Sequence, residues 1–262
     1  MAVSGRKLAD VDGDKPVPAR QENAILRALA RNSNSADKGE IEPAMAAAFS
    51  HSDLRKRVKA IAQVLGSGRV ILPVLPHEVS PEGECPSGQL PKIMLKGVTR
   101  AAAVPVFSSL KAMNEAVDLG LATALSPAGS EEQIPRPLPV SARALAIAAL
   151  DSPGRLLLDA SYLLPRPLLN ALACGDTWVP SWENPDLLAR ISQVIGQLLP
   201  GKEWKILPQV GGPDRLLVAV EPQTPGLAVA LGTLQAEINA LKNLEIAADL
   251  LEVTPVPVAG NN

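Results

Sequence analysis

Apolar residues recur at helical spacing in three stretches of the chain. In the first, they lie three or four residues apart between Asp53, which can cap a helix, and Gly66, which can end one. The members of this stripe are Leu54, Val58, Ile61, Ala62 and Leu65. A second stripe follows Asn184 and Pro185, a pair suited to a helix start, and a third lies nearer the C-terminal end. The pattern predicts three helices, over 54–65, 185–199 and 225–241.

Short apolar runs bounded by Gly or Pro predict the strands. In the first two thirds of the chain these runs are 69–75, 93–95, 101–107 and 155–158. Later runs at 204–210 and 216–220 flank Gly211, Gly212 and Pro213, which predicts a hairpin, and 250–256 forms a last strand. Weaker patterns predict shorter helices from residue 21, from Pro43, over 110–116, over 141–150 and over 167–173. No period is present in 1–20, 77–89 or 118–139, which predicts a tail and two loops.

The order of these elements predicts an α/β (α+β) protein with two mixed sheets, each flanked by helices. Two prolines and a strong helix start come together at 180–185, with two tryptophans nearby, which favours a domain boundary there. We therefore expect a larger N-terminal domain over 21–183 and a small α-β-β-α-β domain over 184–258. Residues 1–20 and 259–262 are expected to be tails.

Composition excludes several classes of function. Hydrophobic residues make up 47% of the 262 residues, and the net charge of -2 provides no field to attract nucleic acid. No signal-like apolar segment and no run long enough to span a membrane is present. The two cysteines are too few for a disulfide framework. The expected location is the cytoplasm, with neither nucleic acid nor a membrane as partner, and the sequence leaves the oligomeric state open.

Candidate catalytic residues are few. The soft metal ligands are His51, His77, Cys85 and Cys174, and no pair has zinc-ligand spacing, so no metal is expected. Cys174 falls at the end of a predicted helix, where the dipole disfavours a thiolate, and we expect it to be a small buried residue.

The glycine and basic motifs also have structural explanations. Gly66 and Gly68 follow a helix instead of preceding one, which is the reverse of a phosphate loop. The basic residues at 55–59 lie opposite the apolar stripe and are expected to be solvated. No catalytic residue and no cofactor is predicted.

Aromatic residues are scarce, at 2% of the chain, yet Tyr162, Trp178 and Trp182 fall within 21 positions. Tyr and Trp are typical of binding hot spots, so these three residues form the candidate partner-binding site. This interpretation predicts that Trp182 is partly exposed. In the alternative, the same side chains fill the seam between two domains.

Several phrases resemble the SseB family, the enhanced serine sensitivity or SseB-like proteins. They are RVILPVL at 69–75, VPVFSSLKAM at 104–113, PLPVSARALAIAAL at 137–150 and LPRPLLNALACGDTWVP at 164–180. The segment after 184 is similar to the C-terminal domain of that family, and the Ala and Pro content suggests an actinobacterial member.

The resemblance implies no catalytic residues and supports a non-enzymatic protein. We therefore expect a protein-interaction or regulatory module whose partner is another protein. The alternative is a small-molecule-binding protein, or an enzyme whose site has no recognisable motif.

Overall fold

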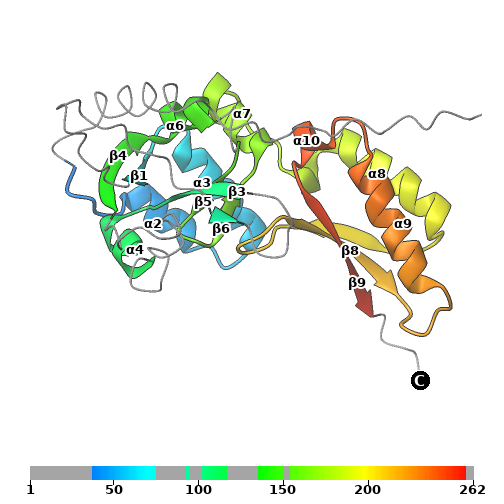
Figure 1. Ribbon diagram of the computed structural model, residues 1–262. Helices are drawn as coiled ribbons and strands as arrows, with labels where there is room; N and C mark the ends of the chain where they lie inside the picture. Colours follow the sequence, from blue (N-terminus) through cyan, green and yellow to red (C-terminus); the bar gives the residue numbers. More distant parts are fainter. Residues whose placement is uncertain (1–36, 75–92, 95–101, 117–134, 150–153, 258–262) are drawn as a thin grey trace, which may run out of the picture.

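The computed structural model describes residues 37–74, 93–94, 102–116, 135–149 and 154–257. The predicted tail at 1–20, the helix from residue 21, the loop at 77–89 and most of the loop at 118–139 lie outside these residues, as do His77, Cys85 and the C-terminal tail. Figure 1 shows the elements gathered in two parts, which we call the N-terminal lobe (Pro43–Cys174) and the C-terminal lobe (Ser181–Pro257).

Short helices and strands alternate in the N-terminal lobe. The helices are α2 (Pro43–Phe49), α3 (Leu54–Leu65), α4 (Leu110–Ala116), α6 (Ala142–Ala149) and α7 (Arg166–Cys174). The strands are β1 (Arg69–Val74), β2 (Ile93–Met94), β3 (Ala102–Val106), β4 (Arg136–Ser141), β5 (Leu156–Leu158) and β6 (Tyr162–Leu164). The predicted cap Asp53 is confirmed, because its side chain accepts a hydrogen bond from the backbone N–H of Lys56. Ser109 and Ser141 each accept one in the same way, from the backbone N–H three residues later.

Two ladders make up the sheet structure of this lobe. Strands β2, β3, β5 and β6 form a mixed sheet in that order, in which β3 and β5 are parallel. Strand β1 pairs antiparallel with β4, and a bridge between Ile71 and Phe107 connects this pair to the end of β3. Beneath them lies one apolar cluster that extends from Met45 to Leu172.

Strand β4 corrects the sequence prediction, which placed a loop through residue 139. Its prolines at 137 and 139 lie opposite Pro73 and Ile71. Proline lacks a backbone N–H and is tolerated in a strand only at an edge, and β4 is an edge of its pair. The closely spaced prolines therefore led to the prediction of a loop where the structure has a strand.

The C-terminal lobe begins with a turn of 3-10 helix, η2 (Ser181–Glu183), and continues with α8 (Pro185–Leu198). Strands β7 (Trp204–Leu207) and β8 (Asp214–Val220) are antiparallel, and β9 (Leu251–Pro257) is parallel to β8. Helices α8 and α9 (Leu227–Asn239) lie side by side over one face of this sheet (Figure 1). A second apolar cluster, from Trp182 to Leu251, fills the space between them. The predicted mixed α/β class is thus confirmed.

One element of this lobe has no sequence signal. The last long helix was predicted through Leu241, but α9 ends at Asn239 and a separate helix, α10 (Leu244–Ala247), follows. Asn243 before α10 and Asp249 after it have positive φ angles of 66° and 68°. Both residues tolerate this conformation better than most, so the chain turns sharply on each side of α10. Within the described ranges, no helix is long and apolar enough to cross a membrane.

Candidate functional site

The predicted aromatic residues lie together at the seam between the lobes. Trp178 packs against both apolar clusters, and its ring meets that of Trp182 edge to face at a centroid distance of 5.8 Å. Tyr162 stacks on Phe49 with ring centroids 5.5 Å apart, and its hydroxyl accepts a hydrogen bond of 3.2 Å from Arg57 Nη1. Tyr162 and Trp178 also line one small cavity.

The expectation that Trp182 is partly exposed is wrong, because only 8% of the residue is accessible. η2 turns its indole into the core of the C-terminal lobe, where it packs with the apolar residues of α8 and the sheet. A large apolar surface that finds a core is buried there, whatever its value in a binding site. Trp178 is half-buried, so the arrangement supports the alternative in which these residues fill the seam.

The basic face of α3 is also used inside the molecule, although the sequence suggested that it is solvated. Arg55 Nη2 donates a hydrogen bond of 2.9 Å to the carbonyl oxygen of Ile206 in β7. Lys59 Nζ lies 2.8 Å from a carboxylate oxygen of Glu183. Arg55 and Lys59 therefore contact the other lobe, whereas Arg57 donates hydrogen bonds within its own lobe and Lys56 is exposed. A solvated face and an interface face have the same residue pattern, and only the fold distinguishes them.

A buried ion pair connects the two lobes. Arg155, just before β5, donates two hydrogen bonds of 2.6 Å to the carboxylate of Asp249, just after α10. The backbone N–H of Arg166 donates a third, of 3.3 Å, to the same carboxylate. Only 1% of the Asp249 side chain is exposed, so removing one partner would leave a charge buried without compensation.

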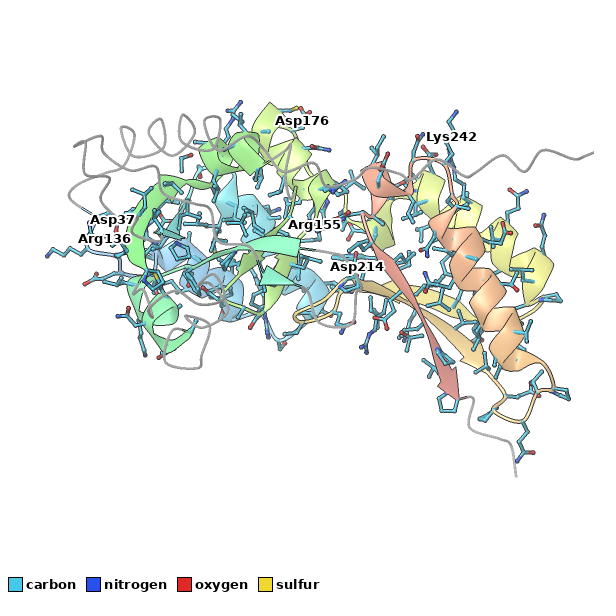
Figure 2. The ribbon with its side chains drawn as sticks, in the orientation of Figure 1. Asp37, Arg136, Arg155, Asp176, Asp214 and Lys242 are labelled. Carbon is cyan, nitrogen blue, oxygen red and sulfur yellow. The ribbon has the colours of Figure 1, made fainter. Side chains whose placement is uncertain are left out.

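Two other carboxyl groups are partly buried: that of Asp214 lies near these contacts, and that of Asp159 lies within the N-terminal lobe. Burial raises the pKa of Asp214 to about 6; the hydrogen bond from Ser181 Oγ, 2.5 Å long, opposes this shift, and the charge of Asp249 adds to it. Burial likewise raises the pKa of Asp159, against the hydrogen bond that the Ser108 backbone N–H donates. Figure 2 shows Arg155 and Asp214 at the centre of the molecule, where the lobes meet. Both carboxyl groups serve contacts inside the fold.

The small cavity that Tyr162 and Trp178 line is not a substrate site. It has a volume of about 20 Å³, and Asp214 and Gln209 also border it. This is room for about one water molecule. Within the part of the chain that the structure covers, Trp178 Nε1 and Gln209 Oε1 are buried without a hydrogen-bond partner, which gives such a water a donor and an acceptor.

A much wider cavity opens between α9, α10 and β9, with a volume of about 610 Å³. Its apolar lining consists of Pro213, Leu241, Leu244, Leu250 and Leu251, and its polar lining consists of Gln235, Asn239, Asn243, Glu245, Asp249 and Glu252. A volume in this range is typical of binding sites, and the lining offers both apolar surface and polar groups to a ligand. We call this hollow the α10 cavity.

One large apolar side chain is exposed next to the α10 cavity. Ile246 of α10 is 62% exposed. It borders two further hollows, one of about 180 Å³ toward the start of α8 and one of about 290 Å³ toward α7. α10 is therefore a short ridge with hollows around it. The α10 cavity was not predicted from the sequence, because the residues that line it come from three separate elements and form no motif.

The remaining candidate residues do not form a site. His51 is exposed, and Cys174 is exposed at the end of α7, which corrects the expectation that this cysteine is buried. Across the described ranges, no three His, Cys, Asp or Glu side chains are grouped to hold a metal ion.

No protein-family model, curated protein or solved structure matches this chain. The resemblance to the SseB family therefore stays a prediction, and the functional argument rests on the geometry alone.

Proposed function

We propose that this chain is a non-enzymatic, cytoplasmic protein-interaction or regulatory module, and that its partner docks on α10 and in the α10 cavity. The observation that carries the proposal is the exposed Ile246 on α10, next to a cavity of about 610 Å³ whose lining is part apolar and part polar. Exposed aliphatic side chains next to concave, partly polar surface are typical of docking sites for other proteins. The SseB-like resemblance is part of the same proposal.

The chemistry of the cavity supports binding over catalysis. The carboxyl groups with raised pKa values, Asp159 and Asp214, line neither this cavity nor its two neighbours. Asp249 does line it, but its carboxylate oxygens are engaged by Arg155. General acid or base catalysis needs a group with a tuned pKa within reach of a bound substrate. The rest of the lining consists of apolar residues, amides and the carboxylates of Glu245 and Glu252, all of which can hold a ligand.

The experiment compares two exposed isoleucines. The tagged chain is used to isolate a partner from the native host, and the purified partner is then titrated against wild type, Ile246→Asp and Ile147→Asp. Ile147 lies on α6 of the other lobe and is 55% exposed, so its substitution is a matched control. We expect Ile246→Asp to weaken binding at least about tenfold and Ile147→Asp to change it less than about twofold. Equal effects, or a larger effect of Ile147→Asp, would refute the proposed site.

The volume of the cavity also favours a second function, binding of a small molecule. About 610 Å³ lies within the range of known ligand sites. Mass spectrometry of the native protein separates the two functions. A bound compound that is lost in Asn239→Trp, which adds a large side chain at an exposed position of the cavity lining, would favour the small molecule over the protein partner.

A further inference from the structure

The outer edge of β9 is closed to another strand. Gln235 of α9 donates a hydrogen bond of 3.0 Å from Nε2 to the carbonyl oxygen of Leu251, and its Oε1 accepts one of 2.7 Å from the N–H of Val253. The side-chain amide thus takes the place that a neighbouring strand would occupy. Outward positions alternate along a strand, and the next two, Pro255 and Pro257, have no N–H to offer. A partner at the α10 cavity is therefore recognised through its side chains.

The charged groups that line the cavity are all carboxylates. They belong to Glu245, Asp249 and Glu252, and no Lys or Arg is among the described residues that border it. Asp249 is paired with Arg155, and Arg166 Nε lies 3.9 Å from the same carboxylate. Arg215 Nε is 3.8 Å from Glu252, but both side chains are more than 40% exposed, and such a pair is weak. Glu245 has no ion pair within the described part of the chain, although it borders a neighbouring hollow together with Arg166. Glu245 and Glu252 are therefore the carboxylates of this cavity that can still pair with a bound cation.

The apolar residues beside these carboxylates restrict the kind of cation further. Leu241, Leu244 and Leu251 border the same hollow as Glu245 and Glu252. A small hydrated cation gains nothing from leucine. A long basic side chain can bury its methylene groups against apolar surface and keep its charged end beside a carboxylate. Arginine also has five N–H donors, which suit a wall that contains both carboxylate and amide oxygens, as those of Glu245 and Asn243.

We propose that the partner segment bound in the α10 cavity carries an arginine, whose methylene groups pack on the leucines and whose guanidinium lies beside Glu245 and Glu252. This inference rests on the proposed function, since it names the chemistry of the partner that docks there. It assigns the contact to side chains alone, because the edge of β9 is already occupied.

The test compares two peptides that differ only in charge. The probes are a labelled peptide containing Ser-Leu-Arg-Leu-Ser and the same peptide with citrulline, a neutral isostere of arginine, and binding to the full chain is measured by fluorescence anisotropy at low salt. We expect the arginine peptide to bind at least about fivefold more tightly. Added salt should reduce this difference, because the Debye length falls to about 3 Å at 1 M.

Variants link the preference to the cavity. The double variant Glu245→Gln and Glu252→Gln should bind both peptides alike. Asp176→Asn is the control, because Asp176 is an exposed carboxylate that lines neither the α10 cavity nor its two neighbouring hollows. It should keep the full preference. Both glutamates are exposed or partly exposed, and circular dichroism confirms that the double variant is folded.

Three results would overturn the inference: equal binding of the two peptides by wild type, a preference that persists in the double variant, or no binding of either peptide up to about 1 mM. These results leave the proposed function intact if the isolated partner still depends on Ile246. Loss of that dependence would instead refute the proposed function, so the two failures are distinguishable.

Discussion

At the seam, the indole rings of Trp178 and Trp182 meet at an interplanar angle of 88°, and neither indole N–H has a partner within the described residues. Their contribution is therefore apolar contact area. The residue types and their clustering in the sequence predicted either a binding site or a filled seam. They could not show whether these side chains face solvent or a core. That distinction depends on which surfaces the fold brings against them, here the two apolar clusters.

Substitution of Trp182 tests this structural role. Trp182→Ala should lower the free energy of unfolding by about 3 to 5 kcal/mol, because it removes a large buried side chain and leaves a cavity. Urea denaturation measures the loss, and Trp204→Ala, in the partly exposed start of β7, should cost less. A loss below about 1 kcal/mol combined with loss of partner binding would instead favour the original hypothesis of a binding residue.

Asp214 makes the stability of the seam depend on pH. Its pKa is raised from 3.8 to about 6, so the folded protein binds this proton more tightly than the unfolded chain does. The stabilisation is fully present below pH 3.8 and is lost as the pH rises through 6. The linked change is on the order of 3 kcal/mol.

Comparison with Asp214→Asn isolates this effect from the other carboxylates. Urea denaturation of both proteins at several pH values between 4 and 7 should show wild type losing stability relative to the variant as the pH rises. Parallel pH profiles would show that Asp214 titrates normally.

Among the elements, sequence reasoning succeeded where a long apolar stripe has its own caps. α3 and α8 are both found with their predicted N-caps, Asp53 and Asn184. It failed for β4, where prolines suggest a loop until a partner strand is known, and for α10, which has only four residues. A stripe of apolar residues at helical spacing indicates a helix with one buried face. β4 and α10, in contrast, depend on contacts with distant parts of the chain.

The role of Gln235 as a cover for the β9 edge can be tested at this scale. Gln235→Ala should lower the free energy of unfolding by about 1 to 3 kcal/mol, because the carbonyl of Leu251 and the N–H of Val253 lose their partner. Glu237→Ala on the exposed face of α9 is the control and should change stability little. Hydrogen exchange at Val253 should become faster only in the first variant, and unchanged exchange there would contradict this role.

For the whole molecule, we expect the contacts across the seam to couple the two lobes into one cooperative unit. The sequence pattern favoured an accessible boundary at 180–185, yet Pro180, Ser181 and Trp182 are buried there. The Arg155–Asp249 pair and the Arg55 contact to β7 add polar connections between the lobes. We expect a single unfolding transition with equal calorimetric and van't Hoff enthalpies.

Arg155→Ala should reduce the stability of this unit by about 3 to 5 kcal/mol, because it leaves the carboxylate of Asp249 buried without its main partner. Differential scanning calorimetry of both proteins measures the loss and the number of transitions. Two well-separated transitions in wild type would show that the lobes fold independently and that the seam adds little.

The α10 cavity belongs to the same scale, since it exists only where α9, α10 and β9 meet. Its residues are leucines, amides and glutamates, which occur throughout the chain and make no motif. No property of the sequence distinguishes Glu245 or Leu244 from their many equivalents. Only the turns at Asn243 and Asp249, which set α10 apart, bring these residues around one hollow.

Hydrogen exchange of the full chain, alone and saturated with its purified partner, tests the proposed docking site most directly. We predict that partner binding slows the exchange of amides in residues 239–252 and changes the exchange rates in the N-terminal lobe little outside α7. Protection confined to other segments, for example α4 and β4, with no change at α10, would contradict it.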